Sequence, residues 1–336
     1  MDIINVYLDI FNGTYELFNK INYHSFIIDF YDCMRKLFYR NNFFLIECLY
    51  ILLAVYINGV LRHLFTIKII DNFIHNGIIR EKYRQYFIRF GWNFVMTILF
   101  VIMFGKFNND YGCMKNLKLL WSDYDNVDKS MPLFFIIGNL IHTSYYIHST
   151  FALIIHDKRD KDFHIWLIHH SIVIIIAAMS YMVGKTFLTS TVGFLLESNE
   201  LIMTMKILLK LQFKFIRKNG NRIRLIILSA LNISWVHIRL FTYPHIVLES
   251  LQFLRQSLGK SEWDIIYVSI YFLYFIIHII NFYWTWIIIN ATFNAFRNGV
   301  RNIEDDREIK DFHSFDNNSS NHDDNVDFIN NNNNQK

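Results

Sequence analysis

Long apolar runs alternate with short polar segments along most of the chain. A helix that crosses a membrane needs roughly 20 mostly apolar residues, and the chain offers several runs near that length. They lie at residues 43–65, 90–105, 133–156, 164–184, 186–207, 225–243 and 265–290. The second run is short, and the fifth contains many polar residues. The pattern predicts an all-α fold, a polytopic transmembrane helical bundle of about seven spans.

Composition narrows the class of protein in the same direction. Of the 336 residues 53% are hydrophobic, with 33 Phe, 19 Tyr and only 2 Pro. This is too apolar for a soluble α/β domain, and it lacks the turn residues of an all-β protein. A net charge of +4 implies no nucleic-acid partner. The 3 cysteines fit neither a disulfide framework nor a zinc site.

Basic residues gather in alternate loops. They are concentrated in the segments 66–89, 157–163 and 206–224 and just after the last span. The positive-inside rule then places the N-terminus in the lumen and the C-terminus in the cytosol. The sequon Asn12-Gly13-Thr14 falls in the predicted lumenal segment, which agrees with this orientation. We expect no cleaved signal peptide, because no basic region and no small-residue cleavage site is evident near residue 1.

The spans and their flanks suggest three parts of the chain. Residues 1–79 hold an N-terminal region with the first span, residues 80–302 hold the other spans, and residues 303–336 form a tail. The tail is rich in Asn and Asp and nearly free of apolar residues. It cannot bury a core, so we predict that it is disordered and cytosolic.

Polar residues recur at helical spacing inside four of the spans. Positions three and four apart share one face of a helix. The four stripes are Thr186, Ser190, Gly193, Glu197, Glu200 and Thr204; Asn139, His142, Tyr146, Ser149 and His156; Tyr271, Tyr274, His278, Asn281 and Thr285; and Asn232, Trp235, Arg239 and Tyr243. We expect these faces to turn away from lipid. They provide either ordinary hydrogen bonds between helices or the wall of a hydrated cavity or lipid tunnel.

Four ionisable residues in neighbouring spans are the strongest candidates for chemistry. His169 and His170 lie in one span, and Glu197 and Glu200 lie in the next. A charged side chain at mid-bilayer costs on the order of 2–3 kcal/mol or more, so such residues are functional candidates. The two spans run antiparallel through a tight turn, which puts the histidines and Glu200 at similar depth on the cytosolic side. We expect the histidines and glutamates to be partners.

An imidazole beside a carboxylate is the usual pairing for general-base catalysis. His169 and His170 are about 100° apart around a helix, so only one is expected to enter the cavity. The alternative is zinc or iron bound by histidine and glutamate. Membrane di-iron hydroxylases carry several histidine boxes, whereas this chain offers the single run from His164 to His170. We therefore expect no metal and no other cofactor.

An ordered set of motifs extends over roughly residues 80–310. The motifs are Lys82-Tyr83-Arg84 through Trp92; Lys161-Asp162-Phe163 followed by His169-His170; Ser180-Tyr181; the acids Glu197 and Glu200; Arg239-Leu240-Phe241 with Tyr243-Pro244; His278 with Tyr283-Trp284; and Asp305-Asp306-Arg307. The set resembles the Lag1 motif and its surroundings in ceramide synthases, within the TLC (TRAM–LAG1–CLN8) domain. By this resemblance residues 80–302 form a TLC-type helical membrane bundle.

The resemblance also implies an activity. Ceramide synthases of the endoplasmic-reticulum membrane join a fatty acyl group from acyl-CoA to the amine of a sphingoid base in sphingolipid biosynthesis. By resemblance His169 and His170 are catalytic, and Glu197 and Glu200 stand in the places of two family aspartates. The chain departs from the family there, because Leu196-Glu197 and Asn199-Glu200 replace His-Asp and Ser-Asp.

Five further residues are expected to contact substrate. They are Tyr146, Tyr181, Arg239, His278 and Trp284. The expected partners are acyl-CoA, a sphingoid base and membrane lipids, and a homo- or hetero-oligomer is compatible with the sequence. The alternative function is a non-enzymatic TLC-domain protein that binds, senses or transports lipid. That alternative predicts bound lipid and no formation of an amide.

Overall fold

The computed structural model describes residues 3–20, 23–40, 43–112, 114–121, 133–156, 163–183, 185–211, 213–258 and 264–298. The chain divides into the units Met1–Ile289 and Asn290–Lys336, and the helices below belong to the first unit, apart from the end of the last helix. The predicted disordered tail at 303–336 and residues 157–162 of the predicted basic turn 157–163 lie outside the described residues.

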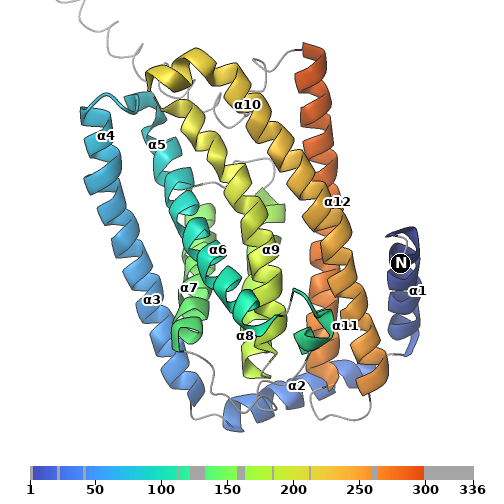
Figure 1. The fold of residues 1–336 in the computed structure, drawn as a ribbon. Helices are drawn as coiled ribbons and strands as arrows, with labels where there is room; N and C mark the ends of the chain where they lie inside the picture. The colour runs from blue at the N-terminus through green and yellow to red at the C-terminus, as the bar shows by residue number, and fades with distance from the viewer. Residues whose placement is uncertain are drawn as a thin grey trace, which may run out of the picture. The chain divides into compact units, whose positions relative to one another are not determined.

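Each of the predicted spans contains an α-helix (Figure 1). The helices are α3 (Phe43–Phe65), α6 (Trp92–Tyr111), α7 (Leu133–His156), α8 (Phe163–Met182), α9 (Thr186–Thr204), α10 (Lys214–Trp235) and α12 (Asp264–Asn298). Among the described residues, 5 stretches are long and apolar enough to cross a membrane: Cys48–His75, Arg84–Tyr111, Phe163–Met182, Leu225–Ser257 and Asp264–Asn294. The described ranges contain no strand. The predicted all-α polytopic bundle is confirmed.

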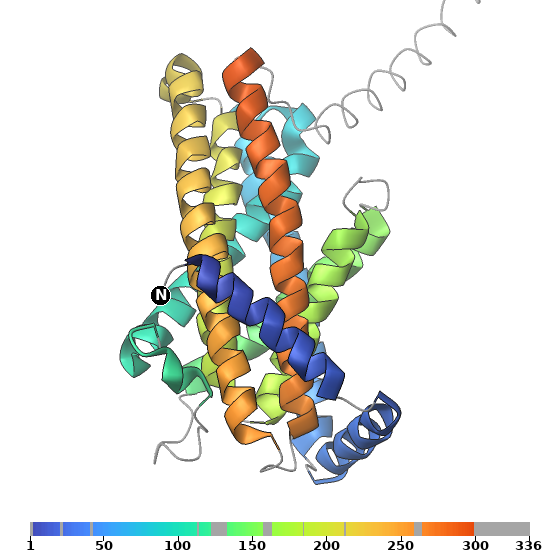
Figure 2. The same ribbon diagram turned by 90° about the vertical axis from the view of Figure 1, so that its right-hand side faces the viewer.

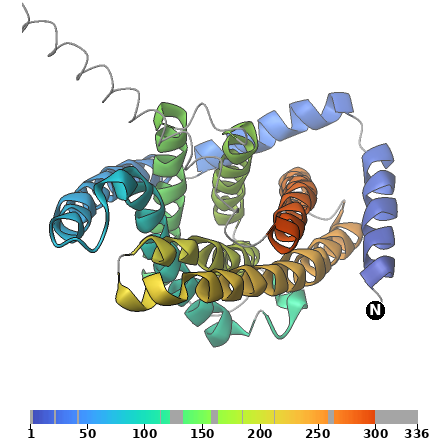
Figure 3. The same ribbon diagram turned by 90° about the horizontal axis from the view of Figure 1, so that it is seen from above.

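The helices α7 and α9 are not among those stretches, because the predicted polar stripes lower their apolar content. α9 packs on α6, α8 and α10, and α7 packs on α3, α6 and α8. Figure 3 shows these neighbours end-on. The polar faces of α7 and α9 therefore meet other helices instead of lipid, which removes much of the cost of a polar residue in a membrane.

Helical structure extends into the predicted loops 66–89 and 206–224 and into 244–264, the predicted connection between the last two spans, so those boundaries are wrong. The first loop contains η1 (Thr66–Ile70), α4 (Asp71–His75), η2 (Glu81–Tyr83), α5 (Arg84–Tyr86) and the start of η3 (Phe87–Gly91).

The other two segments are helical over most of their length. These segments contain η6 (Met205–Lys210), the first turns of α10, and most of α11 (Tyr243–Ser257). The π-helix η7 (Val236–Thr242) joins α10 to α11, and Figure 2 shows the three as one long helix. Pro244 lies in the first turn of α11, where its missing N–H group costs little.

Two N-terminal helices, α1 (Ile3–Lys20) and α2 (Tyr23–Arg40), come before the first predicted span (Figure 2). α1 packs on α11, and it buries Val6, Ile10 and Leu17. Gly13 lies so close to Leu251 of α11 that a larger side chain would collide with it. The first part of the chain is therefore packed against the last part of the bundle.

The predicted sequon lies within this packed helix. The hydroxyl of Thr14 donates to the carbonyl oxygen of Ile10 at 2.6 Å and lies 2.5 Å from the hydroxyl of Tyr271 on α12. Thr14 is buried. In the folded protein Asn12-Gly13-Thr14 is therefore not the exposed loop that an acceptor sequon requires.

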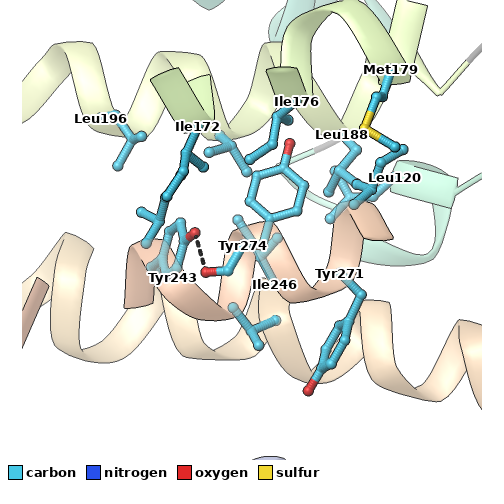
Figure 4. Packing of buried hydrophobic residues seen from close by; sticks show 14 of the residues in the cluster. Leu120, Ile172, Ile176, Met179, Leu188, Leu196, Tyr243, Ile246, Tyr271 and Tyr274 are labelled. Carbon is cyan, nitrogen blue, oxygen red and sulfur yellow. Dashed lines mark hydrogen bonds between the residues drawn. The ribbon is translucent and has the colours of Figure 1, made fainter. Parts of the chain in front are cut away.

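Aromatic side chains fill the interior beside α8, α9 and α12. Tyr243, Tyr271 and Tyr274 are among the largest fully or almost fully buried side chains. The hydroxyl of Tyr243 donates to the carbonyl oxygen of Tyr274 at 3.0 Å (Figure 4). Each large side chain of this kind contributes about 1.5–3 kcal/mol through burial, so this cluster fixes the distance between α11 and α12.

Lys185 anchors the N-terminal end of α9, which begins at the next residue. Its Nζ atom donates to the carbonyl oxygen of Trp121 at 2.7 Å and lies 5.3 Å from the ring centroids of both Phe253 and Tyr267. Trp121, the last residue of η4 (Leu117–Trp121), stacks on Phe253 with the centroids 4.5 Å apart. The carbonyl dipole and the aromatic faces compensate the buried ammonium group. This anchor sets how far α9 extends into the bundle.

Candidate functional site

Glu197 of α9 accepts two hydrogen bonds from α7. Its Oε1 atom lies 3.0 Å from Nε2 of His142, and the hydroxyl of Tyr146 donates to the same oxygen at 2.9 Å. Both His142 and Glu197 are almost fully buried. A buried carboxylate is stable only when hydrogen-bonded or paired, and the polar stripe of α7 provides both partners.

Glu200, one turn further along α9, is held by a different helix. Nδ2 of Asn93 on α6 donates to Oε1 of Glu200 at 3.2 Å, and the hydroxyl of Tyr145 donates to Oδ1 of the same asparagine. Tyr146 therefore bonds directly to Glu197, whereas its neighbour Tyr145 is connected to Glu200 through Asn93. The α6–α7–α9 interface holds the two acids in fixed positions.

His169 and His170 lie on α8 among aromatic rings. The ring centroid of His170 is 5.3 Å from that of Tyr146, and that of His169 is 5.0 Å from Trp284 on α12. The Nδ1 atom of each histidine is buried without a hydrogen-bond partner within the described ranges. The predicted pairing of a histidine with a glutamate is present, but the imidazole that bonds to Glu197 belongs to His142.

The structure shows why the histidines of α8 do not bond to Glu197. The side chain of Tyr146 contacts both the ring of His170 and the carboxylate of Glu197. Glu197 points toward α7, where His142 and Tyr146 are one turn apart on one face. Tyr146 therefore connects the α8 histidines to the carboxylate through an edge-on ring contact, with an interplanar angle of 82° to His170.

Arg239 lies in the π-helix η7 with its side chain inside the bundle. Its Nη1 atom donates to Oδ1 of Asn281 at 2.9 Å, and its Cζ atom lies 4.9 Å from the ring centroid of Trp235. The guanidinium group interacts electrostatically with Glu200 and with His169. Arg239 is therefore a buried cation that interacts favourably with both acids of α9.

His278 lies between two tyrosine rings. Its ring centroid is 5.6 Å from that of Tyr7 and 5.8 Å from that of Tyr243, with interplanar angles of 15° and 24°. Both ring nitrogens are buried without a hydrogen-bond partner among the described residues. Tyr7 belongs to α1 and donates to the carbonyl oxygen of Leu240 at 2.9 Å. Burial raises the pKa of Tyr7 to about 12, so its hydroxyl stays neutral.

Of the predicted substrate-binding residues, the structure brings Tyr146, Trp284 and Arg239 near the histidines, whereas His278 packs against Tyr7 and Tyr243. Tyr146 and Trp284 contact His170 and His169 directly. Tyr181 is near the far end of α8, and the twelve residues from His169 correspond to about 18 Å of helix. Tyr181 is thus separated from the histidines by most of the length of α8.

A cavity opens beside Glu197, between α7, α8, α9 and α12. Its wall is formed by His142, Tyr146, Val173, Ile176, Ala177, Thr189, Val192, Gly193, Leu196, Glu197, Tyr274 and Ile277. Apolar side chains form the middle of this wall. His142, Tyr146 and Glu197 supply polar groups at one end, whereas Thr189 and Tyr274 supply them at the other. The cavity has a volume of about 30 Å³, and neither His169 nor His170 is part of its wall, so the predicted entry of one histidine into the cavity is not observed.

Few of the side chains described at this site could bind a metal ion. His142 and Glu197 are two suitable ligands within bonding distance of each other. Within the described ranges no group of three or more His, Cys, Asp or Glu side chains is placed to hold a metal ion. Proton transfer and hydrogen bonding are the chemistry for which these residues are equipped.

Sequence reasoning included His142 in a polar stripe but did not select it as a site residue, and it did not select Asn93 or Tyr145. It also did not select Trp166 of α8, whose ring centroid lies 6.1 Å from that of His169 and 5.9 Å from that of His170. The spacing of His142 and Tyr146 shows that they share a helix face. It does not show that this face meets Glu197. Asn93 lies outside the predicted stripes, so no periodic signal identifies it.

Comparison with known proteins adds an independent finding. Residues 93–290 match the TLC domain, and this segment contains His142, His169, His170 and both glutamates. A search of curated proteins found no match. The matched segment covers more than half of the chain and includes the described site. The chain therefore belongs to the TLC-domain (TRAM_LAG1_CLN8) family of lipid-related membrane proteins.

Proposed function

We propose that this protein is a ceramide synthase-like N-acyltransferase of the endoplasmic-reticulum membrane. It joins a fatty acyl group from acyl-CoA to the amine of a sphingoid base. The observation that carries the proposal is the buried contact of Tyr146 with both Glu197 and His170, beside an apolar cavity that Tyr146 and Glu197 line. N-acylation of a lipid amine needs both a base and a place for a long chain.

His169 or His170 acts as the base in the proposed reaction. The neutral amine nitrogen attacks the thioester carbonyl carbon, and the imidazole takes the proton that the nitrogen loses as the new C–N bond forms. The tetrahedral intermediate then collapses, the C–S bond breaks, and the imidazolium returns the proton to the leaving CoA thiolate. In a variant of this step the imidazole first receives the acyl group and then passes it to the amine. Both routes give the same amide and free CoA.

Glu197 and Tyr146 are positioning groups in this scheme. Glu197 holds Tyr146 through a 2.9 Å hydrogen bond, and the Tyr146 ring lies against His170. A base must stay within hydrogen-bond reach of its substrate, and a shift of about 1 Å can lower a rate on the order of a hundredfold. The buried acid therefore contributes by fixing the geometry of α7 and α8.

In the proposed reaction acyl-CoA enters from the cytosol and the sphingoid base enters from the membrane. The acyl-CoA headgroup stays near the cytosolic end, where the basic segment 206–224 attracts its phosphates. The acyl chain inserts between α7, α8, α9 and α12, where it must widen the cavity of about 30 Å³ beside Glu197. The sphingoid base reaches the amine site from the membrane. By this proposal the N-terminus is lumenal and the C-terminus cytosolic.

Labelled acyl-CoA and a sphingoid base, supplied to the purified protein, test the proposal. The double variant His169→Ala/His170→Ala is expected to lose at least a hundredfold in N-acyl product, the range of a missing general base. His164→Ala is the matched control, because His164 is exposed on the same helix. Equal product from the double variant and the unmodified protein contradicts the proposal.

A non-enzymatic lipid-binding role is the second candidate. It is favoured by the two hydrogen bonds that hold Glu197 and by the apolar wall of the cavity, because a carboxylate fixed in this way suits a stable binding site. This role predicts lipid that copurifies with the protein, no amide product, and binding that survives loss of His169 and His170. Mass spectrometry of the bound lipid separates the two candidates.

A further inference from the structure

The helix α1 has three faces with different surroundings. One face is buried and packs on the bundle through Val6, Ile10, Thr14 and Leu17. The α1 apolar stripe is 51% to 71% exposed and consists of Ile4, Leu8, Phe11, Tyr15 and Phe18. The α1 polar stripe is also exposed and consists of Asn5, Asp9, Asn12, Glu16 and Asn19. Both sets recur at spacings of four and three, so each set follows one side of the helix.

The apolar surface of α1 is wider than its packing requires. At about 100° per residue, the apolar positions from Val6 round to Leu8 extend over about 200° of the helix. A helix that packs on a core with one side needs an apolar stripe roughly 100° wide. The buried face provides that width. The α1 apolar stripe is therefore additional, and such a continuous exposed stripe marks a contact with a partner or a membrane.

The α1 apolar stripe borders an apolar surface of α12. The ring centroid of Phe11 lies 6.2 Å from that of Phe275, and the centroid of Phe18 lies 6.2 Å from that of Phe272. Beyond these contacts α12 exposes Ile276, Ile279, Phe282, Tyr283, Trp286 and Ile289. This part of α12 belongs to a stretch of membrane-spanning character, so its exposed apolar side chains face lipid. The α1 apolar stripe extends this lipid-facing surface.

The α1 polar stripe borders a polar surface on α11. Oε2 of Glu16 accepts a hydrogen bond from Nη2 of Arg255 at 3.0 Å, and Gln252 and Gln256 beside Arg255 are exposed as well. These residues lie near the last residue of α11, at the end of the bundle where α12 begins. Figure 2 shows α1 (dark blue) lying obliquely across α11 and α12. One edge of α1 therefore borders lipid, and the other borders a polar end of the bundle.

We propose that α1 is an interfacial helix of the lumenal leaflet, with its apolar stripe among the acyl chains and its polar stripe toward the headgroups and lumenal water. An amphipathic helix of this kind buries its apolar side about 5–10 Å into the boundary between headgroups and chains. No third stripe would be needed on a helix that only packs on α11 and α12. The contact with lipid is independent of acyl transfer.

The charge of α1 favours the lumenal leaflet over the cytosolic one. Asp9 and Glu16 are the charged residues of the segment 3–19. Anionic lipids give the cytoplasmic leaflet a negative surface potential, which attracts basic segments and repels acidic ones. The acidic polar stripe is thus suited to the opposite leaflet. This assignment agrees with the proposed lumenal N-terminus.

Neighbouring residues on α1 allow a closely matched test. Single cysteines are introduced into the full chain after replacement of Cys33, Cys48 and Cys113 by serine. Each carries a fluorophore, and the protein is reconstituted in phosphatidylcholine vesicles. The pairs are Leu8→Cys with Asp9→Cys, Phe11→Cys with Asn12→Cys, and Tyr15→Cys with Glu16→Cys. Ile279→Cys on α12 is the reference for a lipid-facing position.

Two quenchers distinguish the stripes. Phosphatidylcholine with a nitroxide near its headgroup should quench the apolar member of each pair roughly twofold or more strongly than the polar member, because that side lies in the leaflet. Aqueous iodide should give the opposite order. The three pairs are independent, so one variant that does not fold leaves the other two. In sealed microsomes, a membrane-impermeant maleimide should label Asp9→Cys only after permeabilisation.

Three outcomes overturn the inference. Equal quenching by iodide within each pair would place both stripes in water. An apolar stripe that neither quencher reaches would mean that protein covers it, and cross-linking through Leu8→Cys would then identify a second copy of the chain. Labelling of Asp9→Cys in sealed microsomes would contradict the lumenal leaflet. Failure of the proposed acyl transfer is distinguishable, because the His169→Ala/His170→Ala protein should keep the same quenching pattern on α1.

Discussion

One oxygen atom of Glu197 receives hydrogen bonds from both His142 and Tyr146, at 3.0 and 2.9 Å. An aspartate at this position would place its carboxylate about one methylene further from α7, so the same two bonds would need a closer approach of the helices. The longer acid is therefore matched to its partners on α7. Its Oε1 atom is the point at which α7 and α9 are joined.

The His142–Glu197 contact is expected to show energetic coupling. His142→Ala and Glu197→Gln should each lower the free energy of unfolding by about 1–3 kcal/mol, because each leaves a buried polar group with a poorer partner. The double variant should cost less than the sum, with a coupling energy of about 1–2 kcal/mol. Denaturant unfolding in detergent micelles measures all three.

A matched pair on α11 controls for substitutions of the same type. His245 and Glu249 lie one turn apart, and the ring of His245 bonds to the carbonyl oxygen of Phe241. His245→Ala and Glu249→Gln should therefore have additive effects. Additive effects at His142 and Glu197 as well would contradict the importance of the buried bond.

At the scale of single helices, hydrophobic patterning predicts well where each helix lies in the sequence. It predicts poorly which faces of different helices contact one another. The predicted stripe on α7 contains His142 and Tyr146, and that on α9 contains Glu197. Periodicity gives the residues that share a face. It contains no information on the rotation of α7 relative to α9, which tertiary packing sets. This is why sequence reasoning paired Glu197 with the histidines of α8.

Lys185 is expected to hold η4 on the bundle. Lys185→Met removes the ammonium group that donates to the carbonyl oxygen of Trp121 and leaves that buried oxygen without this donor, at a cost of about 1–3 kcal/mol. Limited proteolysis near η4 should become faster, and the unfolding midpoint should fall. Lys106→Met is the control, because Lys106 is exposed. Unchanged cleavage in Lys185→Met would contradict this role.

At the scale of the whole molecule, apolar runs of span length predict the bundle correctly, but its N-terminal helices were not predicted. α1 and α2 mix polar and apolar residues at helical spacing and are not among the five stretches of membrane-spanning character in the described ranges. The apolar face of α1 packs on α11, and Thr14 bonds to Tyr271 of α12. The role of this face is therefore clear only when the positions of α11 and α12 are known. The extent of α10 and α11 was also underestimated, because charge clusters and Pro244 resemble the end of a span.

The predicted orientation leads to a direct measurement. A peptide tag at the C-terminus should be accessible to antibody when only the plasma membrane is permeabilised, whereas a tag at the N-terminus should require full permeabilisation. This follows from the positive-inside rule applied to segments 66–89 and 206–224. Tags that become accessible together would contradict the orientation.

The packing of α1 has a consequence for biosynthesis. Thr14 bonds to Tyr271 across a sequence separation of 257 residues. A ribosome adds about 5–20 residues per second, so α1 leaves it roughly ten to fifty seconds before its partner on α12 exists. α1 therefore docks only after the segment of α12 has been made. Until then its apolar face needs a temporary partner, which makes α1 a candidate substrate for a membrane chaperone during synthesis.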